Sequence, residues 1–80
     1  MLRPMPVSVS PLDDYRLNVV FDTGEKKVFD VKPYMSGEFF GQLADAAYFR
    51  SVHISPDGVV EWPDGQDISP DDLYYLSKEA

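Results

Sequence analysis

Residues 15–31 read YRLNVVFDTGEKKVFDV, and this stretch decides the fold because it contains two strands and the turn between them. Within residues 15–21 an apolar or aromatic side chain occupies every second position, which places one apolar row on a single face of a strand. Gly24 lies in the turn, where a positive φ favours glycine. Residues 26–31 return as the next strand, so the stretch predicts an antiparallel hairpin.

The residues before this hairpin predict one further strand and a short leader. Residues 7–10 (VSVS) alternate apolar with polar side chains, and residues 11–14 (PLDD) have the proline and aspartates of a turn. The first third of the chain therefore predicts a three-stranded antiparallel meander. We expect residues 1–5 to form a flexible leader and residues 6–80 to form a single α+β domain.

The middle of the chain predicts short helices. Residues 34–50 lack strand alternation and contain two glycines, which weaken any long helix. We expect one short helix over residues 38–43 and a second that begins at an Asp45 cap and extends through Phe49.

The following segment predicts a second small set of strands. Residues 51–55 and 59–62 have strand character, with a Pro-Asp-Gly turn between them. After a second Pro-Asp-Gly turn, residues 66–68 would add a short edge strand.

The end of the chain predicts a capped helix. In the sequence SPDD, Ser69 is an N-cap residue, a proline occupies the first helical position and two acids follow in the first turn. We expect this helix to reach about Ser77, with Lys78 at the negative end of its dipole. The predicted fold class is α+β: an N-terminal three-stranded antiparallel meander, short central helices, a second small set of strands and a C-terminal capped helix.

Several of these stretches resemble one family. Residues 15–31, together with the motif WPDGQDI at residues 62–68 directly before the capped helix, resemble the bacterial domain of unknown function 2442 family. The similarity extends from about residue 6 to residue 75. It implies an α+β fold with a meander and short helices, in domains that occur alone or joined to a DNA-binding helix-turn-helix domain. It also implies an antitoxin-like role for some stand-alone members, and it transfers no catalytic residue to this chain.

The negative charge of the chain is concentrated in its second half. Residues 51–80 contain seven Asp or Glu and one Lys, whereas residues 1–50 are nearly balanced, and the formal net charge is −7. Such a surface repels nucleic acid and anionic lipid and attracts basic proteins. We therefore predict a basic protein partner, without direct binding to nucleic acid or membranes. The absence of cysteine and of a signal-peptide-like start predicts a cytoplasmic location.

The sequence predicts neither catalysis nor a bound cofactor or metal. His53 is the only histidine and the chain has no cysteine, so we expect an exposed strand residue and no metal ligand. The two Asp-Gly pairs fit turns, because the ordered acids of a calcium-binding loop are absent. Asp71 and Asp72 are neighbours on one helical turn and do not face each other across a substrate. We therefore predict a protein that is not an enzyme.

The surface that we predict for the partner combines aromatic and acidic residues. Aromatic side chains crowd residues 34–49, and not all of them fit into so small a core. Either most of them are core residues or half-buried lids, or some line an exposed patch that binds a partner. As an alternative, the same aromatic residues would line the pocket of a small-ligand sensing domain. An unpaired edge strand at residues 7–10 or 66–68 would also allow a homodimer. The candidate partner-binding residues are Tyr34, Phe40, Tyr48, Glu61, Asp64, Asp67, Asp71 and Tyr75.

Overall fold

The computed structural model of the chain describes residues 4–79, apart from the side chains of residues 38 and 39. The predicted α+β fold is confirmed. In chain order the elements are β1 (Pro6–Leu12), β2 (Arg16–Phe21), β3 (Lys26–Asp30), η1 (Lys32–Tyr34), α1 (Gly37–Gly41), η2 (Gln42–Ala44), α2 (Ala46–Phe49), β4 (His53–Ile54), β5 (Val60–Glu61), β6 (Asp67–Ile68), α3 (Pro70–Leu76) and β7 (Lys78–Glu79).

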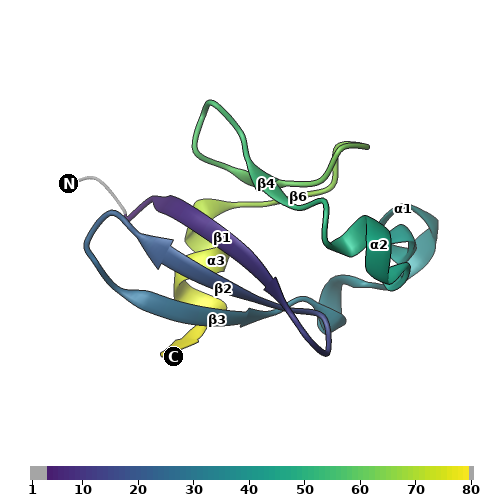
Figure 1. Cartoon of the computed structure of the whole chain (residues 1–80), viewed down its shortest axis with the longest axis horizontal. Helices are drawn as coiled ribbons and strands as arrows, with labels where there is room; N and C mark the ends of the chain where they lie inside the picture. Colours follow the sequence, from purple (N-terminus) through teal and green to yellow (C-terminus); the bar gives the residue numbers. More distant parts are fainter. Residues whose placement is uncertain (1–3, 80) are drawn as a thin grey trace.

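The first sheet contains β1, β2, β3 and β7 in that order, and all three pairs are antiparallel. Its first three strands are the predicted meander (Figure 1). Leu17, Val19 and Phe21 on β2 are each at most 1 % exposed, so alternate positions of this strand face the core as expected. Residues 1–3 of the predicted leader lie outside the described residues. Met5 exchanges hydrogen bonds with Asp22, through its backbone N–H at 3.2 Å and its carbonyl oxygen at 2.8 Å.

The turn between β1 and β2 lies further along the chain than predicted. β1 continues through Pro11, and Leu12 pairs with Arg16, so the turn occupies residues 13–15. Proline is compatible with β1 because this is an edge strand, where one side of the backbone needs no partner. Asp14 and Tyr15 have φ of 64° and 57°, so Tyr15 belongs to the turn and not to the strand.

The chain ends in a strand that the sequence did not predict. α3 stops at Leu76 and Ser77 is extended, so Lys78 lies in β7 and not at the end of the helix. β7 pairs with β3, which places Glu79 opposite Lys27. Opposite charges at directly opposed positions favour such a pair. This partner is distant in sequence, and local propensity therefore gave no sign of it.

The second sheet contains β4, β5 and β6, which are antiparallel and two residues long each. These strands confirm the predicted set, although each is shorter than expected. One cross-strand row consists of Ile54, Val60 and Ile68, and Val60 and Ile68 are at most 3 % exposed. Because side chains alternate along a strand, the other row faces away from the core.

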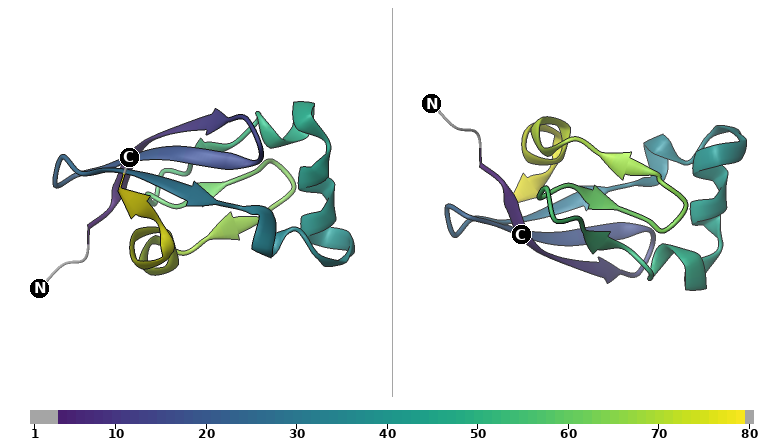
Figure 2. Two further views of the ribbon diagram at one scale, coloured as in Figure 1. Left: turned by 90° about the horizontal axis from the view of Figure 1, so that it is seen from below. Right: turned by 90° about the horizontal axis from the view of Figure 1, so that it is seen from above.

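The two sheets form layers that enclose the core. In Figure 1 the second sheet lies above the first, and both views of Figure 2 show the sheets overlapping. The helices α1 and α2 close one end of the long axis, and the β2–β3 turn lies at the other end (Figure 1). The buried apolar side chains come from both sheets and from the helical segments: Leu17, Val19, Phe21, Phe29, Val31, Leu43, Phe49, Val60, Trp62, Ile68 and Leu73.

The two predicted caps are present. Asp45 Oδ1 accepts from the backbone N–H of Ala47 at 2.9 Å and begins α2, and Ser69 Oγ accepts from the N–H of Asp72 at 3.2 Å and begins α3. α3 then buries Leu73 completely against the core. The caps thus fix the start of each short helix, while Pro70, Leu73 and Tyr74 pack α3 against the rest of the protein.

Candidate functional site

The outward row of the second sheet brings together three residues of the acidic half. His53 on β4 is opposite Glu61 on β5, and Glu61 is opposite Asp67 on β6. His53 and Asp67 are exposed and Glu61 is half-buried. The row exists because the neighbouring residues Ile54, Val60 and Ile68 point inward, so that every second position of these strands must point to solvent.

Asp64 completes this group in the tight turn between β5 and β6. The turn is closed by backbone hydrogen bonds from Trp62 N–H to Gln66 O at 2.8 Å and from Gly65 N–H to Trp62 O at 2.9 Å. The side chain of Asp64 is exposed, while its backbone N–H donates to the hydroxyl of Tyr48 at 2.9 Å. We call the three carboxylates Glu61, Asp64 and Asp67 the acidic hairpin.

His53 is held as a neighbour of the acidic hairpin. Its Nδ1 lies 3.2 Å from the carbonyl oxygen of Ser51, and its Nε2 lies 3.0 Å from Oε2 of Glu61. The carbonyl of Ser51 and the carboxylate of Glu61 raise the pKa of His53, in that order of importance, and desolvation opposes them. The sequence correctly predicted an exposed strand histidine. It did not predict the contact with Glu61. The signal was that alternation places His53 and Glu61 on the outward face of two adjacent strands.

Tyr48 has a structural role that the sequence did not predict. Its hydroxyl donates to Oε1 of Gln66 at 2.7 Å and accepts from Asp64, so it joins α2 to the hairpin turn. Gln66 is the fully buried polar residue of the core, and its Nε2 also donates to Oε1 of Gln42. Among the predicted partner residues, Tyr48 therefore supports the acidic hairpin from beneath.

Tyr34 and Phe40 are half-buried and pack against the core. The ring of Tyr34 lies 5.5 Å from that of Phe29, and burial followed by the charge of Asp72 raises the pKa of Tyr34. These side chains come from η1 and α1 and are not part of the acidic hairpin.

Asp71 and Tyr75 lie on α3. Asp71 is half-buried, whereas Tyr75 is 71 % exposed and Leu76 beside it is 60 % exposed. The ring of Tyr75 meets that of Tyr74 edge-on at 5.2 Å, and the hydroxyl of Tyr74 donates to the carboxylate of Glu25 at 2.8 Å. The prediction that Tyr75 is available at the surface agrees with its exposure, but it belongs to a different element from the acidic hairpin.

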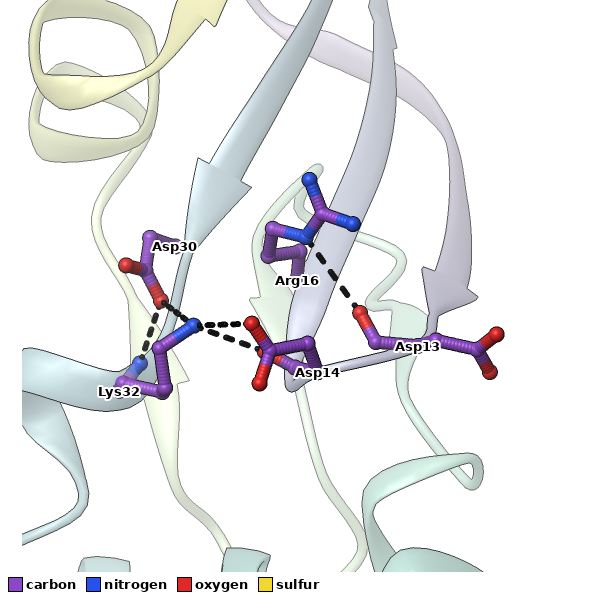
Figure 3. A network of polar contacts seen from close by, with 5 residues as sticks. All are labelled: Asp13, Asp14, Arg16, Asp30 and Lys32. Carbon is purple, nitrogen blue, oxygen red and sulfur yellow. Dashed lines mark hydrogen bonds and ion pairs between the residues drawn. The ribbon is translucent and has the colours of Figure 1, made fainter.

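A separate charged cluster fixes the end of the first sheet (Figure 3). Nζ of Lys32 lies 3.0 Å from Oδ2 of Asp14 and 3.3 Å from Oδ1 of Asp30, and it donates to the carbonyl oxygen of Asp14 at 3.0 Å. The hydrogen bond to Asp14 is the main reason why the pKa of Lys32 is raised. Lys32 thus connects the β1–β2 turn to the end of β3. Asp14 and Asp30 are therefore already paired within the chain.

An open hollow lies beside the acidic hairpin, next to Asp64. Across residues 4–79 no group of three His, Asp or Glu side chains is arranged to hold a metal ion. The hollow of about 240 Å³ is lined by Gln42, Asp45, Tyr48 and Asp64. Within the described range, every buried side-chain nitrogen or oxygen atom has a hydrogen-bond partner.

The helices of residues 4–79 are all too short or too polar to span a bilayer.

The two edges that we predicted for a homodimer carry features that oppose pairing. β1 contains Pro6 and Pro11, and its register with β2 is irregular between Pro6 and Ser8. β6 is only two residues long and begins with the charged Asp67. Prolines, bulges, short strands and charges all disfavour the addition of a second chain to an edge.

Comparison with known proteins places the chain in a family context. The family model described as Protein of unknown function (DUF2442) matches residues 6–79. No curated protein and no solved structure matches the chain.

Proposed function

The chain belongs to the DUF2442 family of proteins of unknown function, and we propose that it is a non-enzymatic protein-interaction module whose acidic hairpin binds a basic protein. An antitoxin-like or regulatory role, with a small basic toxin as the partner, is one form of this proposal. We place the protein in the bacterial cytoplasm, because a chain without cysteine is suited to a reducing compartment.

One observation carries the proposal: Glu61 and Asp67 are directly opposite each other on neighbouring strands. Like charges at directly opposed positions destabilise a sheet. The fold therefore holds two carboxylates side by side at its surface, with Asp64 in the connecting turn and His53 as a contact of Glu61. A cationic side chain that binds between them would relieve this repulsion, which makes the hairpin a suitable place for Arg or Lys of a partner.

The charge of the whole segment extends this local attraction. Residues 51–80 have a net charge of −6, so a basic partner is attracted from a distance before it makes contact. This attraction is screened by salt over about 8–10 Å at ordinary ionic strength. Association through the hairpin should therefore weaken strongly as salt is added.

The test compares two variants that remove the same amount of charge. The double variant D64N/D67N neutralises two acids of the hairpin, and the control D13N/D22N neutralises two exposed acids outside residues 51–80. Tagged full-length chains are recovered from the native host at about 0.05 M and about 0.5 M salt, and co-purified proteins are quantified by mass spectrometry.

We expect one specific basic protein to be recovered with the wild-type chain and the control at low salt. It should be lost at high salt and with D64N/D67N. Equal recovery with both variants, or recovery of no specific protein at low salt, would contradict the proposal. Circular dichroism of each variant verifies that the chain is folded.

A further inference from the structure

Among residues 4–79, His53 is the titratable cation in contact with the acidic hairpin, and its ring faces two hydrogen-bond acceptors. The ring nitrogens of His53 face the carbonyl oxygen of Ser51 at 3.2 Å and the carboxylate of Glu61 at 3.0 Å. A neutral imidazole has one N–H and can donate to only one of them, whereas the imidazolium donates to both. The geometry therefore favours the charged form of His53 in the free protein.

Few other charges face His53. Glu61 is its direct cross-strand neighbour, and Asp67 lies one strand further along the same row. β1, which packs against β4, carries no charged side chain. Arg50 precedes β4 in sequence and lies 4.0 Å from Asp13. Beside the carbonyl of Ser51, Glu61 is thus the carboxylate of the acidic hairpin that favours the charged form of His53.

We propose that binding of a basic segment to the acidic hairpin is coupled to release of the proton from His53, so that association strengthens as the pH rises. This inference rests on the proposed function and names its regulation. A cation that approaches Glu61 is repelled by the imidazolium of His53. Once bound, this cation replaces the imidazolium as the counter-charge of Glu61. Reciprocally, a partner that prefers neutral His53 must lower the pKa of His53 when it binds.

The size of the effect follows from the exposure of the pair. The side chains of His53 and Glu61 are 46 % and 34 % exposed, so solvent weakens their interaction. Exposed ion pairs of this kind change an equilibrium by roughly two- to fivefold. Histidine is the side chain whose ordinary pKa lies between about pH 5 and 8, and the chain contains only one.

The experiment uses hexa-arginine as the basic probe, because guanidinium groups stay charged throughout this pH range. Backbone amide shifts of the full-length, isotope-labelled chain report where the peptide binds and with what dissociation constant. The ring resonances of His53 report its pKa with and without the peptide. We expect shifts at the acidic hairpin, a lower pKa of His53 in the complex, and roughly two- to fivefold tighter binding at about pH 8 than at about pH 5.5.

Two substitutions separate the charge states. H53Q, which is permanently neutral, should bind at both pH values as the wild type does at high pH. H53K, which is permanently charged, should bind at both as the wild type does at low pH. If H53Q retains the wild-type pH dependence, or if the pKa of His53 in the complex is unchanged or raised, the coupling is wrong while the hairpin site stands. If hexa-arginine shifts no hairpin resonance at either pH, the proposed binding site itself fails, and this inference fails with it.

Discussion

The hydroxyl of Tyr48 donates to Oε1 of Gln66 at 2.7 Å and accepts from the backbone N–H of Asp64 at 2.9 Å, so one side chain of α2 fixes the turn that presents the acidic hairpin. Gln66 is fully buried, and a buried amide needs hydrogen-bond partners to offset its loss of water. The turn between β5 and β6 therefore contributes Gln66 to the polar network in the core and Asp64 to the acidic surface.

Tyr48→Phe should lower the free energy of unfolding by about 1–3 kcal/mol, because it removes a partner from a buried amide and from a backbone N–H. Urea unfolding followed by circular dichroism measures the change. The matched control is Tyr75→Phe, whose parent side chain is 71 % exposed and which should leave stability nearly unchanged. Equal effects of the two substitutions would show that the Tyr48 hydroxyl does not hold the turn.

Two leucines of α3 provide a test of how this helix is held. Leu73 is completely buried and Leu76 is 60 % exposed, on the same helix. Leu73→Ala should cost about 2–5 kcal/mol through lost burial and the cavity that it leaves. Leu76→Ala should change the free energy of unfolding by less than about 0.5 kcal/mol. Thermal and urea unfolding of both variants distinguish them, and a large loss for Leu76→Ala would mean that α3 packs differently.

The N-cap of α3 predicts a smaller, local effect. Ser69→Ala removes the acceptor for the N–H of Asp72 and should lower the free energy of unfolding by about 1 kcal/mol. Ser36 occupies the corresponding position of α1 but makes no side-chain cap bond, so Ser36→Ala should cost much less. If the two substitutions were equivalent in urea unfolding, the hydrogen bond of Ser69 would not contribute to stability.

The pKa of His53 should fall when its carboxylate partner is removed. In Glu61→Gln the carbonyl of Ser51, the larger cause of the raised pKa, remains, so only part of the increase should be lost. Ring resonances of His53 followed by NMR against pH measure this directly. Asp67→Asn, one strand further along the row, should lower the pKa by less. An equal or larger decrease for Asp67→Asn would contradict the assigned contact.

The raised pKa of His53 also predicts how stability depends on pH. Because the pKa is higher in the folded chain than the ordinary value of about 6.5, the contribution of His53 is fully present below that value. It is lost as the pH rises through the folded pKa. The wild-type chain should therefore lose stability relative to His53→Gln between about pH 5.5 and about pH 8.5. Urea unfolding at both pH values measures the free energy of unfolding of the two chains. An unchanged difference between them, or a relative gain for the wild type as the pH rises, would contradict the raised pKa.

The sequence predicted those parts of the fold that depend on local chemistry. Alternation placed Leu17, Val19 and Phe21 on one buried face, and Ser69 and Asp45 were recognised as caps because the capping side chain bonds to the residues that follow it directly. The turn at Asp13 was misplaced, since Pro11 is typical of a turn but is also tolerated in an edge strand. The alternation also predicts Tyr15 as a strand residue, because no neighbouring residue indicates its positive φ.

For the candidate site, sequence reasoning named the acids of the hairpin but not their arrangement. Charge alone points to Glu61, Asp64 and Asp67. The sequence predicts Tyr48 as a surface aromatic residue, whereas in the structure its hydroxyl supports the turn from within. From the sequence alone Gln66 is indistinguishable from an exposed turn residue, because its partners Gln42 and Tyr48 lie in other segments.

The sequence by itself determined the α+β class, the meander, the capped helix and the negative charge of the second half, because these follow from side-chain period, capping chemistry and composition. Only the tertiary structure decided that β7 adds an edge strand to the first sheet and that Tyr48 and Gln66 form a hydrogen bond. It also decided that His53, Glu61 and Asp67 form one outward-facing row. The first two depend on packing between segments far apart in the chain, and the third depends on the register in which three short neighbouring strands pair.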